Sequence, residues 1–83
     1  MQVTLKLFAS LGSCLPPGAK RNKIVVDVDS GTTILGLLDA HQVPREKCHL
    51  VLLNGIFHAP EERGKVALKA GDVLAVWPPV AGG

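Results

Sequence analysis

The chain has 83 residues, enough for one folded domain and too few for two. Hydrophobic residues make up 47% of the sequence and charged residues 19%, which excludes an intrinsically disordered chain. The formal net charge of +2 is too small to indicate nucleic-acid binding by itself. Two cysteines, Cys14 and Cys48, do not make a disulfide scaffold, so we expect a reducing, cytoplasmic location.

Neither a membrane span nor a signal peptide is expected from the hydrophobic patterning. The longest apolar runs are 50–53 and 73–77, far below the roughly 18 residues that a membrane-spanning helix needs. Lys6 interrupts the first apolar stretch, and a strand-like alternation begins at once, which argues against a signal peptide.

The first part of the sequence predicts two strands joined by a long turn. Apolar residues alternate with polar ones in 3–7 and again in 24–28, the pattern of half-buried strands. The segment between them, 10–22, is rich in glycine and proline and is predicted as a turn. Two such strands suggest an antiparallel hairpin.

An amphipathic helix is predicted next, over 33–41. Apolar residues there recur with the helical period, and Ser30 or Thr32 is expected to cap the first turn. Pro44 then ends the segment, because its ring cannot continue the helical hydrogen bonds.

The second half predicts three more strands. The continuous apolar run 50–53 favours a strand covered on both faces. Asn54-Gly55 is a strong signal for a type I′ turn into a short strand at 56–58. An irregular polar stretch, 59–69, follows, and the last strand is predicted over 73–77.

This order of elements fits an α+β fold of the β-grasp type. In that fold a mixed sheet of about five strands packs on one helix, with the first and last strands central and parallel. A ferredoxin-like fold would need a second crossover helix, and Pro60 and Gly64 argue against one. We expect one domain over 1–77 and a flexible diglycine tail over 78–83.

The common catalytic motifs are absent from the sequence. It contains no phosphate-binding GxxxxGK[ST], no HExxH and no GxSxG. The three histidines are widely spaced and have no cysteine at ligand spacing, so no metal site is expected. The segment 61–63 is predicted as a solvated turn. The basic residues in 20–23 are not interleaved with aromatic residues, so no nucleic-acid partner is expected.

The end of the sequence is its most distinctive feature. The last predicted strand is followed by Pro78, Pro79, Val80, Ala81, Gly82 and Gly83. Prolines end a strand and favour an extended conformation, so they direct the tail away from the body. Gly82 has no Cβ, so the backbone can enter a slot that a side chain would block. The tail is therefore suited to deliver the Gly83 carboxylate into another protein; the alternative is a merely frayed terminus.

The sequence resembles the β-grasp sulfur carriers, ubiquitin-like proteins that include the small subunit of molybdopterin synthase and the thiamine-pathway sulfur carrier. The resemblance covers essentially the whole chain: 3–7, 33–41, 53–55, 70–73 and 78–83. The Pro-Pro-Val-Ala-Gly-Gly ending is its specific part, and it most resembles the molybdopterin synthase small subunit.

This resemblance implies a carrier that is not catalytic alone and binds no cofactor stably. A ubiquitin-activating-type enzyme would use ATP to adenylate the Gly83 carboxylate, and sulfur from a persulfide would then replace AMP to give a thiocarboxylate. The large subunit of molybdopterin synthase, or another sulfur acceptor enzyme, would receive the tail. With that large subunit the chain would form a sulfurtransferase that builds molybdopterin for the molybdenum cofactor.

The resemblance also implies roles for individual residues. Gly83 bears the sulfur, Gly82 gives clearance, Val80 and Ala81 line the slot, and Pro78 and Pro79 aim the tail. An apolar docking patch is expected on the exposed sheet face, with candidates Leu53, Phe57 and Trp77. Each of these three is otherwise an ordinary core residue.

Two other interpretations remain open from the sequence. In the first, the chain carries sulfur for another product, such as thiamine thiazole or thiolated tRNA. In the second, it is a ubiquitin-like modifier that ends in an isopeptide bond to lysine. An interpretation of a different class is a small RNA- or protein-binding module with an inert terminus.

Overall fold

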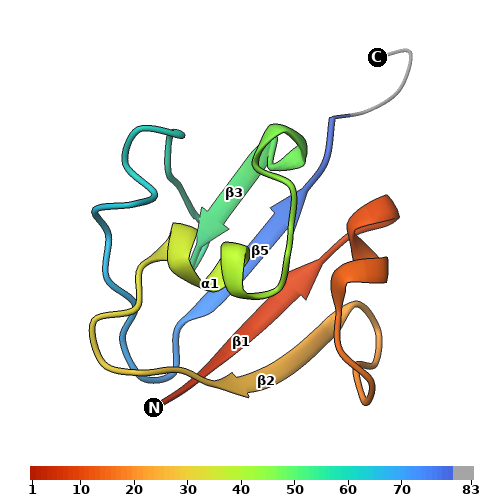
Figure 1. Cartoon of the computed structure of the whole chain (residues 1–83), viewed down its shortest axis with the longest axis horizontal. Helices are drawn as coiled ribbons and strands as arrows, with labels where there is room; N and C mark the ends of the chain where they lie inside the picture. The colour runs from red at the N-terminus through yellow and green to blue at the C-terminus, as the bar shows by residue number, and fades with distance from the viewer. Residues whose placement is uncertain (80–83) are drawn as a thin grey trace.

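One mixed sheet and one α-helix organise residues 1–79, which the computed structural model describes (Figure 1). The strands are β1 (Gln2–Leu7), β2 (Lys23–Asp27), β3 (Leu50–Leu53), β4 (Ile56–Phe57) and β5 (Val73–Trp77). The helix is α1 (Ile34–Ala40), and the two 3-10 helices are η1 (Ala9–Cys14) and η2 (Arg45–Lys47). No helix within these residues is long and apolar enough to cross a bilayer.

The sheet has the strand order β2-β1-β5-β3-β4. Its two central neighbours, β1 and β5, run parallel, whereas β1–β2, β3–β5 and β3–β4 are antiparallel. Figure 1 shows β1 and β5 side by side, with α1 lying across one face of the sheet. This arrangement confirms the predicted β-grasp fold.

The core lies between the sheet and α1. Alternation along β1 places Val3, Leu5 and Leu7 on the face toward the helix, where each is almost fully buried. The helix contributes a buried stripe to the same cluster: Ile34, Leu37 and Leu38. The face of the sheet opposite α1 is hereafter called the outer face, and Val25 on β2 and Phe57 on β4 are exposed there.

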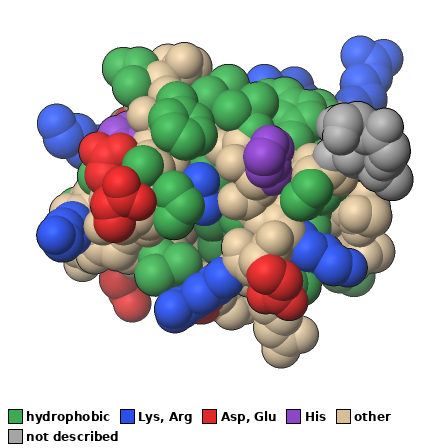
Figure 2. All heavy atoms as spheres, turned by 90° about the horizontal axis from the view of Figure 1, so that it is seen from above, with side chains coloured by type: hydrophobic (Ala, Val, Ile, Leu, Met, Phe, Trp, Pro, Cys, Tyr) green, Lys and Arg blue, Asp and Glu red, His purple; other side chains and the backbone are tan. Residues whose placement is uncertain are grey.

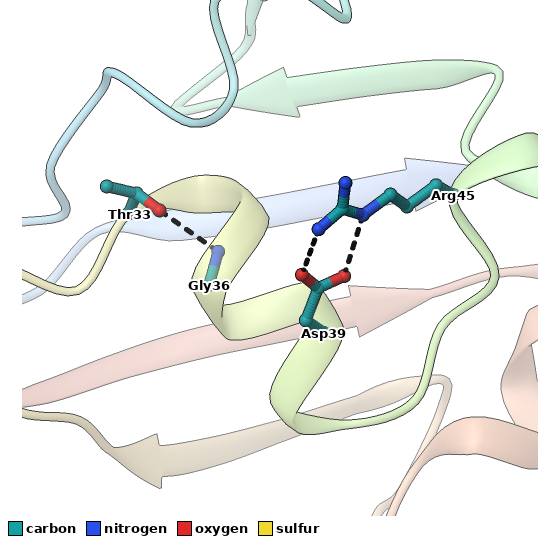
Figure 3. A network of polar contacts seen from close by, with 4 residues as sticks. All are labelled: Thr33, Gly36, Asp39 and Arg45. Atoms are coloured by element: carbon teal, nitrogen blue, oxygen red, sulfur yellow. Dashed lines mark hydrogen bonds and ion pairs between the residues drawn. The ribbon is translucent and has the colours of Figure 1, made fainter.

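The cap of α1 differs from the one predicted. Thr33, not Ser30 or Thr32, has the extended backbone of a cap, and its hydroxyl oxygen accepts a hydrogen bond from the Gly36 amide at 3.0 Å (Figure 3). Thr32 instead bonds to Leu68 through its backbone carbonyl. The helix therefore begins one residue later than the predicted 33–41.

An exposed ion pair ties η2 to α1. Arg45 donates two hydrogen bonds to the Asp39 carboxylate, at 2.6 and 3.2 Å (Figure 3). The hydrogen bond from Arg45, with its charge, lowers the pKa of Asp39. Any stabilisation from the pair is therefore present above the ordinary carboxyl pKa and lost as the pH falls. Because both side chains face solvent, that contribution is small.

Three segments differ from the sequence-based expectation. Strand β3 is not covered on both faces, because α1 packs against one face only and Leu50 remains 36% exposed. The segment 10–22 includes most of η1, which buries Leu11 in the core. Arg63, predicted in a solvated turn, is only 4% exposed. Its guanidinium donates to the backbone carbonyls of His58 and Cys48, which fastens the 59–69 segment to the body.

The turn between β3 and β4 also anchors the start of β5. Asn54 and Gly55 have φ values of 51° and 83°, as a type I′ turn requires. The Asn54 side chain accepts from the Val73 amide and donates to Asp72, both at 2.9 Å. Asp72 in turn accepts from the Lys69 amide at 2.7 Å. This network fixes the point at which the chain enters the centre of the sheet.

We expect Asn54→Ala to lower the free energy of unfolding by about 2–3 kcal/mol, since it removes both side-chain bonds and replaces asparagine, which tolerates positive φ, with alanine, which does so poorly. Asn54→Gly is the matched control, because it removes the same bonds without backbone strain and should cost about 1 kcal/mol less. Urea denaturation measures both values. Equal losses for the two variants would contradict this account.

Candidate functional site: the outer sheet face and the end of β5

The outer face carries a row of side chains that crosses all five strands. The strand registers place Phe57 opposite Leu52, Leu52 opposite Ala75, Ala75 opposite Lys6, and Lys6 opposite Lys23. Side chains of opposed residues lie on the same face of a sheet. One end of this row is therefore aromatic and aliphatic, and the other end is basic.

The apolar half of the outer face lies on β3, β4 and β5, and on the residue that follows β1. Its members are Phe8, Leu50, Leu52, Phe57, Ala75 and Trp77. Phe57 is 52% exposed, although a large apolar side chain gains by leaving water. Figure 2, which looks onto the molecule from above, shows hydrophobic side chains gathered in a band along its upper edge. Leu50 is also exposed, whereas Phe8, Leu52 and Trp77 are half-buried and Ala75 is buried between them. A partly exposed apolar patch of this kind is typical of a protein-binding surface.

Three contacts fix the end of β5, whose last residue is Trp77. Its ring stacks on Phe8, with centroids 4.5 Å apart and planes within 6°. Its carbonyl accepts from the His49 amide at 3.0 Å, and the preceding Val76 carbonyl accepts from the Phe8 amide at 3.1 Å. The chain is thus fixed up to the point where Pro78 and Pro79 begin.

Two of the three predicted docking residues lie on the outer face, and one does not. Phe57 and Trp77 belong to the apolar half, as the registers show. Placing Leu53 on the exposed face was wrong: it is 8% exposed and packs in the core. The physical reason is the two-residue period of β3, which turns Val51 and Leu53 toward α1.

Sequence analysis missed Leu52 and Phe8. The alternation of β1 through Thr4 and Lys6, continued by one step, puts Phe8 on the outer face. The sequence therefore indicated the side on which Phe8 lies, but it did not indicate which side chain Phe8 contacts. Only the parallel pairing of β1 with β5 brings Phe8 beside Trp77. The predicted tail residues Val80, Ala81, Gly82 and Gly83 lie outside the described residues.

Other chemistry-bearing side chains do not form a second site. Among residues 1–79, no three His, Cys, Asp or Glu side chains are grouped to hold a metal ion. Burial raises the pKa of the Cys48 thiol, and the nearby Arg63 charge offsets this only in part. A raised pKa disfavours the thiolate, which is the nucleophilic form of a cysteine.

Comparison with protein families and solved structures identifies what this architecture belongs to. The model of the ThiS family matches residues 5–83, nearly the whole chain. The chain belongs to the ThiS family. It is accordingly a ubiquitin-like protein of the kind that serves as a sulfur carrier or a modifier.

Several solved structures share the fold of this ThiS-family chain. The crystal structure of SAMP1 from Haloferax volcanii is 32% identical with a TM-score of 0.68, and each chain covers 100% of the other. The solution structure of the HVO 2177 protein of the same organism is 28% identical with a TM-score of 0.72, covering 100% of this chain and 87% of its own.

A third structure is a complex of subunits 1 and 2 of the molybdopterin-converting factor from Helicobacter pylori. The matching chain is 22% identical, with a TM-score of 0.60 and complete coverage of both chains, so it shows the fold alone. Comparison with curated protein sequences gives no significant match.

Phe8→Ala should lower the free energy of unfolding by about 1–3 kcal/mol, because it removes both the stack on Trp77 and apolar contact area. Phe8→Tyr is the control and should stay close to the parent protein. Trp77 is the single tryptophan, so its fluorescence follows unfolding in urea, and its spectrum in the folded protein reports the stack. A fluorescence spectrum of folded Phe8→Ala that matches the parent would contradict this role.

Proposed function

We propose that this ThiS-family protein carries sulfur as a thiocarboxylate on Gly83 and donates it for molybdopterin synthesis. The observation that carries the proposal is the end of β5. There a central strand, anchored at Trp77, leads directly into Pro78 and Pro79 and then into the last four residues, Val-Ala-Gly-Gly. A firmly held strand end followed by residues with small side chains suits a reactive group that other proteins must reach.

Two activation steps are needed, because a carboxylate is an unreactive acyl group. In the first step a Gly83 carboxylate oxygen attacks the α-phosphorus of ATP, pyrophosphate leaves, and an acyl adenylate forms on the partner enzyme. In the second step the terminal sulfur of a persulfide attacks the carbonyl carbon and displaces AMP. A thiol then reduces the resulting acyl disulfide, which leaves the thiocarboxylate and a disulfide.

The carrier contributes position rather than catalytic groups to these steps. The apolar half of the outer face would dock on the adenylating enzyme and later on the large subunit of the synthase or another acceptor enzyme. Residues without large side chains at 81–83 would let both enzymes enclose the same carbon. The partners would supply the charge stabilisation in the transition states.

The sequence of the tail favours molybdopterin as the destination of the sulfur. The Pro-Pro-Val-Ala-Gly-Gly ending most resembles that of molybdopterin synthase small subunits. A protein-modifier role is the second candidate, because SAMP1, at 32% identity over the whole chain, belongs to the small archaeal modifier proteins. The two roles share the acyl adenylate and differ in the acceptor that attacks it.

The proposal is tested by intact-mass analysis after incubation with the adenylating enzyme of the same organism, ATP, a persulfide donor and a thiol. We expect a mass increase equal to the replacement of one oxygen by sulfur. Adding the large subunit and the pterin precursor should then remove that sulfur and form the dithiolene product. Lysine conjugates in place of a thiocarboxylate would favour the modifier role, and neither product would refute both.

Variants of the tail test whether Gly83 is the reacting residue. Deleting Gly83, adding a residue after it, or changing Gly82 to Val should abolish thiocarboxylate formation, because each displaces the carbonyl carbon or blocks its path. Ala81→Gly adds no bulk and should remain active. All four should melt within a few degrees of the parent, because the last residues of a chain ordinarily contribute little packing. Full activity of the Gly82→Val protein would refute the slot argument.

A further inference from the structure

The outer face has a basic half beside its apolar half. Lys6 and Lys23 lie opposite each other on β1 and β2, in the same row as Ala75, Leu52 and Phe57. Adjacent strands are separated by about 4.8 Å, so the row spans roughly 19 Å from Phe57 to Lys23. The lysines therefore adjoin the apolar half without an intervening gap.

Negative charge is nearly absent from this face. Among the outer-face positions of the five described strands, Asp27 is the single acidic residue, and it pairs with Gln2 at the opposite end of β2 from Lys23. Lys20 and Arg21, both exposed, add to the positive charge just before β2. The separation of charge is thus a property of the face rather than of the whole chain, whose net charge is only +2.

The basic half also contains a hollow. A depression of about 270 Å³ is lined by Thr4, Gly18, Lys20, Lys23, Ile24 and Val25. Val25 is exposed beside the two lysines, so the hollow combines an apolar wall with two ammonium groups. This combination suits an acidic side chain, whose methylene groups pack while its carboxylate is paired.

We infer that the outer face binds a protein surface in which an apolar patch is flanked by carboxylates that contact Lys6, Lys20 and Lys23. The apolar contacts would supply most of the affinity, and the charges would set the association rate and the orientation. This inference rests on the proposed function only for the identity of the partner, the adenylating enzyme.

A single-stranded nucleic acid fits the face less well. Base stacking needs aromatic rings with a free face aligned along a basic groove. Phe8 and Trp77 stack on each other, and Phe57 lies at the far end of the row from Lys23. The other members of the apolar half, Leu50, Leu52 and Ala75, are aliphatic, which favours a protein partner.

The test compares two variants that make the same charge change on opposite sides of the sheet. Lys23→Glu reverses a charge on the outer face. Lys65→Glu reverses a charge on the side of the sheet where α1 lies. Lys65 is between Arg63 and Val66, and the backbone carbonyls of those two residues accept hydrogen bonds from α1 amides. Both lysines are exposed, so neither variant disturbs the core.

Association of the unmodified protein with the adenylating enzyme is followed by stopped flow, without ATP or sulfur donor. At about 50 mM salt we expect Lys23→Glu to slow association about 5- to 20-fold and Lys65→Glu to slow it less than about 2-fold. At about 500 mM salt the difference should largely vanish, because the Debye length falls to about 4 Å.

Equal slowing by the two variants, insensitivity to salt, or no association at all would overturn the inference. Tighter binding of a fluorescent single-stranded oligonucleotide, weakened by Lys23→Glu and not by Lys65→Glu, would also overturn it in favour of nucleic acid. The assay involves no chemistry at Gly83. A selective effect of Lys23→Glu without any thiocarboxylate would therefore refute the proposed function while supporting this inference.

Discussion

The parallel pairing of β1 with β5 is the constraint on which the rest of the structure depends. It brings the first and last strands of the described chain together at the centre of the sheet, from Thr4 opposite Val73 to Leu7 opposite Val76. Parallel neighbours need a long connection, and the intervening residues supply it as α1 and the remaining strands. Because β5 lies between β1 and β3, hydrogen bonds hold both of its edges. The tail therefore begins from one of the most firmly held strands of the molecule.

The two faces of this sheet differ in how far their side chains are buried. The inner face buries Val3, Leu5 and Leu7 against α1, and this burial stabilises the fold. The outer face leaves Leu50 and Phe57 partly in water, at a cost in solubility. In an 83-residue chain, packing one helix against one face of the sheet gives a single small core. Polar connections such as Asn54 with Asp72, and Arg63 with two carbonyls, reinforce that core where loops join it.

Much of the fold was predictable from local patterns. The alternation in β1 and β2, the helical period of α1 and the Asn54-Gly55 turn each depend on residues close in sequence, and each matches the structure. The errors arose where distant residues decide the outcome. Thr32 does not cap α1, and its backbone carbonyl instead accepts a hydrogen bond from Leu68. Arg63 is buried where the Cys48 carbonyl accepts its hydrogen bond. Neither partner is visible in a sequence window.

The sequence by itself determined the class of fold, the family resemblance and the diglycine ending, because composition, period and terminal residues are local properties. Only the tertiary structure decided which side chains share the outer face. Leu52 and Leu53 are neighbours in an uninterrupted apolar run, so nothing in that run distinguishes them. They differ because Leu53 lies on the sheet face that α1 covers and Leu52 lies on the other face. The stack of Phe8 on Trp77, and the row from Phe57 to Lys23, exist because strand registers join residues far apart in the chain.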